Sequence, residues 1–162
     1  SVMKRAKALG FDGRAKALTP AIDKAFDNAF LARRAAGPYW RKMTPAQQQR
    51  YVALFRRLSI AQHAGRFKGF GGESFKIVGT TDPGRGYRLV KTVLTTGKGE
   101  TISINYLMGN RGGQWKIVDV FTKGTISEVA TRRSEFSNIL KTQGVDALIA
   151  AIEGKINREK TG

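Results

Sequence analysis

Four short apolar segments in the middle of the chain, joined by glycine-rich turns, constrain the fold most. The segments are ESFKIVGTT (73–81), GYRLVKTVLTT (86–96), ETISINYLMG (100–109) and QWKIVDVFTK (114–123). The stretches that separate them, DPGRG, GKG and NRGG, are rich in residues that form tight turns. Because a parallel connection needs about a dozen residues or more, we predict that consecutive strands pair antiparallel, as a meander.

The alternation of side chains within these strands predicts which faces are buried. In the third segment one set of alternate residues is apolar, namely Ile102, Ile104, Tyr106 and Met108. This pattern predicts a sheet with one buried face. In the fourth segment both alternate sets are largely apolar, and the first consists of Trp115, Ile117, Asp119 and Phe121. We therefore expect the fourth strand to be covered on both sides, with a single carboxylate inside it.

Helices are expected on both sides of the strands, over residues 1–68 and 125–157. Three helix starts are indicated by Thr19 before Pro20, by Thr44 with Gln47 in a capping box, and by Thr125 with Glu128 in a second box. Gly144 is placed to end the helix that follows, because glycine readily adopts the left-handed conformation of a C-terminal cap. This order predicts an α+β fold: a curved four-stranded antiparallel sheet packed against N-terminal and C-terminal helices, as an NTF2-like cone with extra helices.

The chain is strongly basic, with a net charge of +17. Residues 1–68 hold 15 Lys and Arg against 3 Asp and Glu, a balance of +12, whereas residues 69–162 hold 14 against 9, a balance of +5. A positive field concentrated in the N-terminal part favours an anionic partner: nucleic acid, an acidic protein surface or a phospholipid membrane. A solubilising surface without a partner explains the same charge.

Several kinds of site are poorly supported by the sequence. There is no cysteine and one histidine, His63, and the carboxylates are not clustered, so we expect no metal site. No glycine cluster leads into a helix with Lys-Ser or Lys-Thr, as a phosphate-binding loop requires. No nucleophile elbow is present. We therefore expect no cofactor.

Two alternative functions remain open on the residues alone. In an NTF2-like enzyme, Asp119 would serve as a base with a raised pKa, and His63 and Tyr106 would meet it in the pocket. A structural Asp119 would instead accept hydrogen bonds from backbone N–H groups, or pair with Arg132 or Arg133. A basic nucleic-acid-binding module would need exposed aromatic residues, but the aromatic residues here fall on apolar stripes, so no nucleic-acid partner is expected.

The chain also resembles a known family, most clearly in its C-terminal half. The stretch GGQWKIVDVFTKGTIS, followed by RRSEF and ILKTQGVDALIAAI, is similar to the toluene-tolerance auxiliary family, the MlaC-like periplasmic phospholipid carriers. The matching positions are Trp115, Asp119, Val120, Gly124, Ser127, Arg133, Ser134, Phe136 and Gly144. Upstream, GPYWRKMTPAQQQRYVALFRRL and INYLM match further segments in the same order, so the resemblance spans residues 20–156. YLM, GTIS and RRSEF are closest to the HpnM branch, which is associated with hopanoid biosynthesis.

The resemblance implies a non-enzymatic periplasmic carrier. It would hold acyl chains or a hopanoid-type lipid in an apolar cavity, and shuttle the lipid between membrane-bound components of an Mla-type ABC transport system. A monomer that touches an anionic membrane surface is expected. Residues 1–162 would form a single lipid-binding domain, without its signal peptide and the start of its first helix. Asn105 and Glu128 depart from the family pattern, which leaves the choice of lipid open.

The apolar stripes of the long helices and central strands suggest the lining of such a cavity. We expect the lipid to contact some of Phe30, Tyr51, Phe55, Leu58, Leu94, Ile104, Tyr106, Trp115, Ile117 and Phe136. Asp119, with Arg132 or Arg133, is expected to fix the rim.

Overall fold

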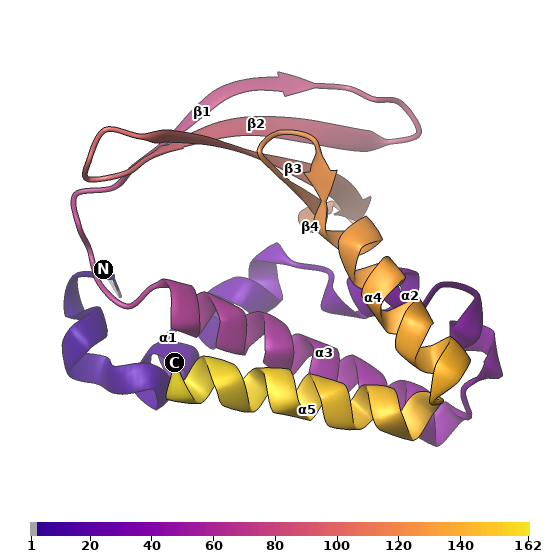
Figure 1. The fold of residues 1–162 in the computed structure, drawn as a ribbon. Coiled ribbons are helices and arrows are strands. Elements are labelled where there is room, and N and C mark those ends of the chain that lie inside the picture. Colours follow the sequence, from indigo (N-terminus) through magenta and orange to yellow (C-terminus); the bar gives the residue numbers. More distant parts are fainter. Residues whose placement is uncertain (1–2) are drawn as a thin grey trace.

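The computed structural model describes residues 3–162, with the helices in one layer and an open sheet that arches over it (Figure 1). The helical elements are η1 (Met3–Arg5), α1 (Ala6–Ala25), α2 (Asn28–Ala36), η2 (Gly37–Lys42), α3 (Pro45–Arg66), α4 (Glu128–Thr142) and α5 (Val145–Thr161). The strands are β1 (Ser74–Thr81), β2 (Tyr87–Thr95), β3 (Thr101–Arg111), β4 (Gln114–Thr122) and β5 (Ile126–Ser127). They pair antiparallel in the order β1-β2-β3-β4-β5. The predicted α+β class and meander are confirmed, and the two-residue β5 adds a fifth strand too short to show alternation.

Two of the predicted helix ends are confirmed. At the start of α3 the Thr44 hydroxyl accepts a hydrogen bond from the Gln47 N–H at 3.2 Å, and the Gln47 side chain accepts one from the Thr44 N–H at 2.9 Å. After α4, Gly144 has a φ of +91° and its N–H donates to the Ile139 carbonyl at 3.1 Å. Both ends therefore follow from local sequence alone.

The helix start predicted at Thr19 is wrong. Thr19 lies inside α1, and its hydroxyl donates to the Ala15 carbonyl at 2.7 Å instead of capping. The reason is tertiary: buried Arg14 donates to the carbonyls of Ala64 in α3 and of Ala6. These bonds hold the chain before Pro20 in the helical layer.

The start predicted at Thr125 is also wrong. The residue that caps α4 is Ser127, whose hydroxyl accepts from the Ala130 N–H at 3.0 Å. Ile126 and Ser127 pair with β4 as strand β5, which keeps this segment extended until Glu128. The sheet therefore overrides the local signal.

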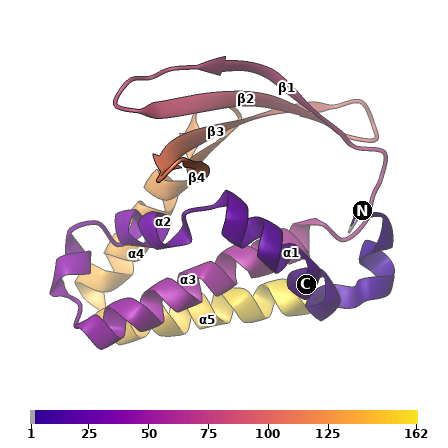
Figure 2. The same cartoon turned by 180° about the vertical axis from the view of Figure 1, so that it is seen from behind.

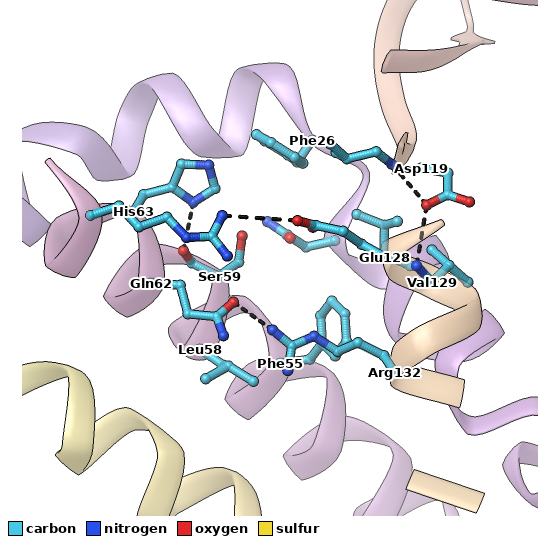
Figure 3. Close-up of a pocket in the computed structure, with 14 residues that line it drawn as sticks. Phe26, Phe55, Leu58, Ser59, Gln62, His63, Asp119, Glu128, Val129 and Arg132 are labelled. Carbon is cyan, nitrogen blue, oxygen red and sulfur yellow. Dashed lines mark hydrogen bonds and ion pairs between the residues drawn. The ribbon is translucent and has the colours of Figure 1, made fainter. Parts of the chain in front are cut away.

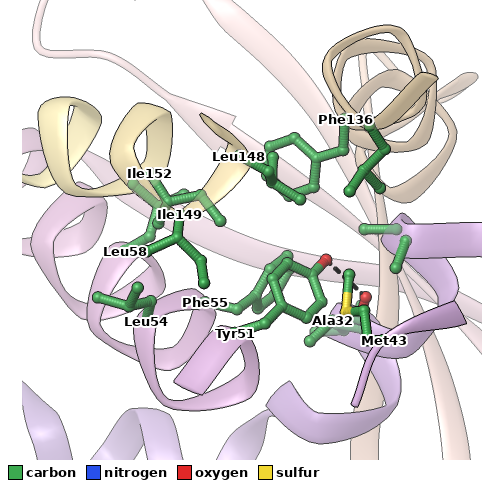
Figure 4. Close-up of a cluster of buried hydrophobic side chains, with 14 of the residues drawn as sticks. Ala32, Met43, Tyr51, Leu54, Phe55, Leu58, Phe136, Leu148, Ile149 and Ile152 are labelled. Carbon is green, nitrogen blue, oxygen red and sulfur yellow. Dashed lines mark hydrogen bonds between the residues drawn. The ribbon is translucent and has the colours of Figure 1, made fainter. Parts of the chain in front are cut away.

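The hydrophobic core lies within the helical layer (Figure 4). Tyr51, Phe55 and Phe136 pack edge to face with ring centroids 6.2–6.4 Å apart. The Tyr51 hydroxyl, fully buried, donates to the Ala32 carbonyl at 2.7 Å. Side chains of α5 complete the core, including Leu148, Ile149 and Ile152. Because the helices bury these residues against one another, most of the sheet is not needed to cover them.

The sheet is attached to the helices at its β4 end. The Asp27 N–H donates to the Ile117 carbonyl at 3.0 Å, and the Lys116 ammonium donates to the Asp23 carbonyl at 3.0 Å. From this attachment β2 and β1 arch away from the helices (Figure 2). The expectation that β4 is covered on both sides holds in its middle, where Ile117 and Val118 are both buried.

Candidate ligand-binding site

One face of the sheet looks toward the helices. Val120 of β4 identifies it, because this residue lines a cavity together with residues of α3 and α4, and Tyr106 of β3 is its cross-strand partner. Cross-strand partners share a face, so the residues in register with Tyr106 lie on the same side. The apolar residues of this side, here called the inner sheet face, are Phe75, Ile77, Val90, Leu94, Ile102, Ile104, Tyr106, Met108, Trp115, Ile117 and Val120. The polar residues in the same register are Thr80, Arg88, Thr92, Asn110 and Thr122.

The β1 half of the inner sheet face is apolar but uncovered. Phe75 is 54% exposed, Ile77 64% and Ile102 40%. Large apolar side chains scattered singly over a surface are ordinary, but a contiguous set indicates a binding site. Here the set faces the helices across the concave side of the sheet, so an apolar partner would be enclosed from both sides.

At the β4 end the space between the layers closes to a cavity of about 50 Å³ (Figure 3). Its apolar lining comes from Phe26, Leu31, Phe55, Leu58, Val120 and Val129. Its polar lining comes from Asn28, Ser59, Gln62, His63, Arg66, Asp119, Glu128 and Arg132. Pockets for small molecules have about 300–1,000 Å³, so this cavity alone is too small to enclose a lipid.

Asp119 joins β4 to α4. Its Oδ1 accepts hydrogen bonds from the N–H groups of Val120 at 2.7 Å and Val129 at 3.2 Å. Its Oδ2 accepts from the Ser127 hydroxyl at 2.5 Å, and that hydroxyl caps α4. Among residues 3–162 no ion pair joins Asp119 to an arginine. The carboxylate therefore fixes the start of α4 at the cavity wall.

The fold and this geometry can be compared with known proteins. The model of the MlaC protein family matches residues 1–154. The chain belongs to the MlaC family. A solved structure from Ralstonia solanacearum, a phospholipid-binding protein in complex with a phospholipid, is similar with a TM-score of 0.82 and 18% identity. The similarity covers 95% of this chain and 86% of that one. No helix of this MlaC-family chain within residues 3–162 has the length and apolarity to cross a membrane.

The residues predicted to contact a lipid fall into four groups in this MlaC-family structure. Phe55 and Leu58 line the cavity. Leu94, Ile104, Tyr106, Trp115 and Ile117 lie on the inner sheet face. Tyr51 and Phe136 are fully buried in the helical core. Phe30 lies apart from these groups, with the Arg111 guanidinium 4.8 Å from its ring centroid. The Arg88 guanidinium lies 4.6 Å from the ring centroid of Trp115. The first two groups together enclose the candidate site.

Neither predicted rim arginine forms an ion pair with Asp119 among residues 3–162. Arg132 lines the cavity and donates to the Gln62 side chain at 2.5 Å, with its guanidinium 5.9 Å from the Phe136 ring centroid. Arg133 is exposed and lies against Gly37. Arg132 is therefore part of the site, whereas Arg133 lies at the junction of α2 and η2.

Asp119, Arg132 and His63 were named from the sequence, whereas the other polar residues of the cavity, Asn28, Ser59, Gln62, Arg66 and Glu128, were not predicted as site residues. The sequence pattern that could have indicated them is at Gln62. This residue continues the stripe of Tyr51, Phe55 and Leu58, where an apolar residue is expected. One turn further along the same stripe lies Arg66, which pairs with Glu128 at 3.9 Å. A polar continuation of an apolar helix face therefore marks the inner end of this site.

His63 makes the stability of the fold depend on pH. Its Nδ1 lies 2.7 Å from the Ser59 carbonyl. Burial is the main cause that lowers the pKa of His63 below 6.5, and Arg66 acts in the same direction. Because the unfolded state binds the proton more tightly, the free energy of unfolding should fall as the pH drops through about 6.5 toward the folded-state pKa.

The measurement for His63 is urea unfolding of the wild type and His63→Gln at pH 7.5 and 5.5. We expect the wild type to lose more of its unfolding free energy than the variant does over this range. An equal loss in both proteins would show that His63 does not cause the dependence.

Proposed function

We propose that this protein is a phospholipid carrier that encloses acyl chains between the inner sheet face and the helices. The observation that carries the proposal is the uncovered apolar half of that face, which continues into the cavity at the β4 end. The structurally similar Ralstonia protein is described as phospholipid-binding and in complex with a phospholipid, which supports the same class of ligand here.

The magnitude of apolar burial is sufficient for binding. Each buried methylene contributes about 0.8 kcal/mol, so covering about ten of them gives about 8 kcal/mol before the costs of association. Since the cavity itself has only about 50 Å³, the chains must lie mainly on the open concave side. The lipid would thereby cover Phe75, Ile77 and Ile102.

Membership of the MlaC family supports the cellular role. We assign the carrier to the periplasm, where it exchanges its lipid with membrane-bound components of an Mla-type ABC transport system. A hopanoid-type lipid is the alternative ligand, on the resemblance to the HpnM branch. No catalytic step is assigned to the chain, and it acts as a monomer.

Transfer of a phospholipid between vesicles tests the proposal. Donor vesicles carry a fluorescent phosphatidylglycerol together with a quencher that stays behind, and acceptor vesicles carry neither. A carrier should raise the transfer rate in proportion to its concentration. A rate that does not change with protein concentration would remove the proposed function.

Exposed basic residues are expected to bring the carrier to anionic membranes. Every Lys and Arg among residues 4–68 is exposed except Arg14 and Arg56. Four of them lie close in sequence at the end of α2 and in η2: Arg33, Arg34, Arg41 and Lys42. Because exposed charges are screened beyond about 10 Å in 0.1 M salt, binding to phosphatidylglycerol vesicles should weaken as salt is added.

A charge-reversal variant locates this surface. Each basic residue near an anionic membrane contributes about 1 kcal/mol, so Arg41→Glu with Lys42→Glu should weaken vesicle binding by about tenfold or more. Lys98→Glu with Lys123→Glu, in exposed turns of the sheet, is the matched control and should bind like the wild type. Equal loss in both variants would indicate net charge rather than this surface. Vesicle sedimentation measures the binding.

A further inference from the structure

The inner end of the cavity contains a buried polar group that a plain acyl chain does not satisfy. Asn28, the first residue of α2, lines the cavity and is 7% exposed. Its Oδ1 has no hydrogen-bond partner among residues 3–162. A buried polar atom left in this way is destabilising, and a functional ligand is one common explanation.

Further hydrogen-bonding capacity lies around the same cavity. The Arg132 guanidinium has five N–H donors, and within residues 3–162 its one hydrogen bond goes to the Gln62 side chain. The Ser59 carbonyl can only accept, so the neighbouring Nδ1 of His63 carries the proton. Because burial lowers the pKa of His63, its ring is neutral at pH 7.5, with Nε2 as an acceptor. The cavity therefore offers both donors and acceptors.

The charges around the cavity favour a neutral polar group over an anion. Two cations, Arg66 and Arg132, are balanced by two carboxylates, Asp119 and Glu128. An anionic headgroup would meet the two carboxylates as well as the arginines. A hydroxyl carries no charge and both donates and accepts, so it can serve Asn28 and a neighbouring donor at once.

We propose that the cavity binds a hydroxyl group on the buried part of the ligand, so that the carrier prefers lipids with a hydroxylated acyl chain. The hydroxyl donates to Asn28 Oδ1 and accepts from an N–H of Arg132 or Gln62. The apolar residues Phe55, Leu58 and Val129 enclose the adjoining methylene groups. This inference rests on the proposed function, because it names the class of chain that the carrier selects.

The experiment compares stearic acid with a series of hydroxystearic acids whose hydroxyl lies at successive carbons. Each competes with a fluorescent stearic acid for the delipidated protein at pH 7.5. One net hydrogen bond corresponds to about three- to tenfold in affinity, so at least one isomer should bind about three- to tenfold more tightly than stearic acid. If water rather than a ligand satisfies Asn28, every isomer will bind equally or more weakly, and the inference fails.

Two variants connect such a preference to Asn28. Asn28→Leu keeps the approximate shape but removes the amide, so it should bring the ratio of affinities to about one or below while stearic acid still binds. Asn138→Leu makes the same replacement at an exposed position of α4 and should keep the wild-type ratio. A preference that survives Asn28→Leu would overturn the inference.

Two further outcomes complete the test. If Asn28→Leu does not fold, the wild-type series still decides whether a preference exists. Gln62→Leu then removes one proposed donor and also the side chain that holds the other donor, Arg132, so a smaller ratio is expected. An unchanged ratio would count against the inference. If stearic acid binds without any preference for a hydroxyl, the inference alone fails. If neither kind of chain binds and vesicle transfer is also absent, the proposed function fails with it.

Discussion

The double variant Phe75→Asp with Ile102→Asp is expected to lose its lipid while keeping its fold. Both side chains lie on the uncovered half of the inner sheet face, where Phe75 is 54% and Ile102 40% exposed, so the folded protein without lipid leaves both in contact with water. Bound acyl chains would enclose the two new carboxylates, and an unpaired buried charge costs several kcal/mol. Affinity for phospholipid should therefore fall by more than about a hundredfold, measured by lipid retained after gel filtration.

The matched control for this variant lies on the opposite face. Val93 pairs with Ser103 and Lys76, out of register with the inner sheet face, so Val93→Asp should retain lipid. A thermal melt of each variant shows whether folding is preserved. Lipid retention by a folded Phe75→Asp with Ile102→Asp variant would place the acyl chains elsewhere.

Asp119→Asn is expected to destabilise the fold by about 1–3 kcal/mol, because it removes a charged acceptor of two N–H groups and one hydroxyl. For a chain of this size each kcal/mol lowers Tm by about 2–4 °C, so a fall of about 2–12 °C should be measured. Lipid transfer should decrease only in proportion to the folded fraction, since these hydrogen bonds give Asp119 a structural role.

Asp146→Asn is the control for this second prediction. Asp146 is an exposed acidic residue in the first turn of α5, where loss of its charge costs about 0.3–1 kcal/mol through the helix dipole. An Asp119→Asn variant that melts like the wild type would remove the structural role. If transfer or turnover were also lost at full stability, a chemical role for Asp119 would be required.

The strands and their connectivity were predictable because their signals are local. Tight turns with glycine permit only antiparallel pairing of neighbours, and the Thr44 capping box needs only Gln47 three residues later. The errors came where distant contacts decide. Arg14 holds the chain before Pro20 in α1 through a carbonyl of α3, and pairing with β4 keeps Ile126 extended.

The inner sheet face was predictable on β3 but not on β4. Alternation correctly groups Ile104 with Tyr106, because β3 keeps its register with β2 throughout. In β4 an irregularity at Val118 moves the pattern by one residue, so Ile117 shares its face with Val120 instead of with Asp119. A bulge of this kind has no signal in a run of apolar residues.

The helical part of the candidate site was only partly predictable for a different reason. An apolar stripe shows that a side chain is buried, but not which layer buries it. Tyr51 and Phe55 lie on one stripe, yet the first is enclosed by helices and the second also lines the cavity. Asn28 gave no signal, since its burial depends on how α2, α3 and α4 meet.

Mass spectrometry of an organic extract from the purified protein tests the central claim most directly. The protein is purified without detergent, extracted with chloroform and methanol, and compared with an equal amount of Phe75→Asp with Ile102→Asp prepared in the same way. We predict phospholipid, or a hopanoid-type lipid, in near-stoichiometric amount from the wild type and almost none from the variant. A wild-type extract without lipid, or equal amounts from both proteins, would contradict the account of a carrier that encloses acyl chains against the inner sheet face.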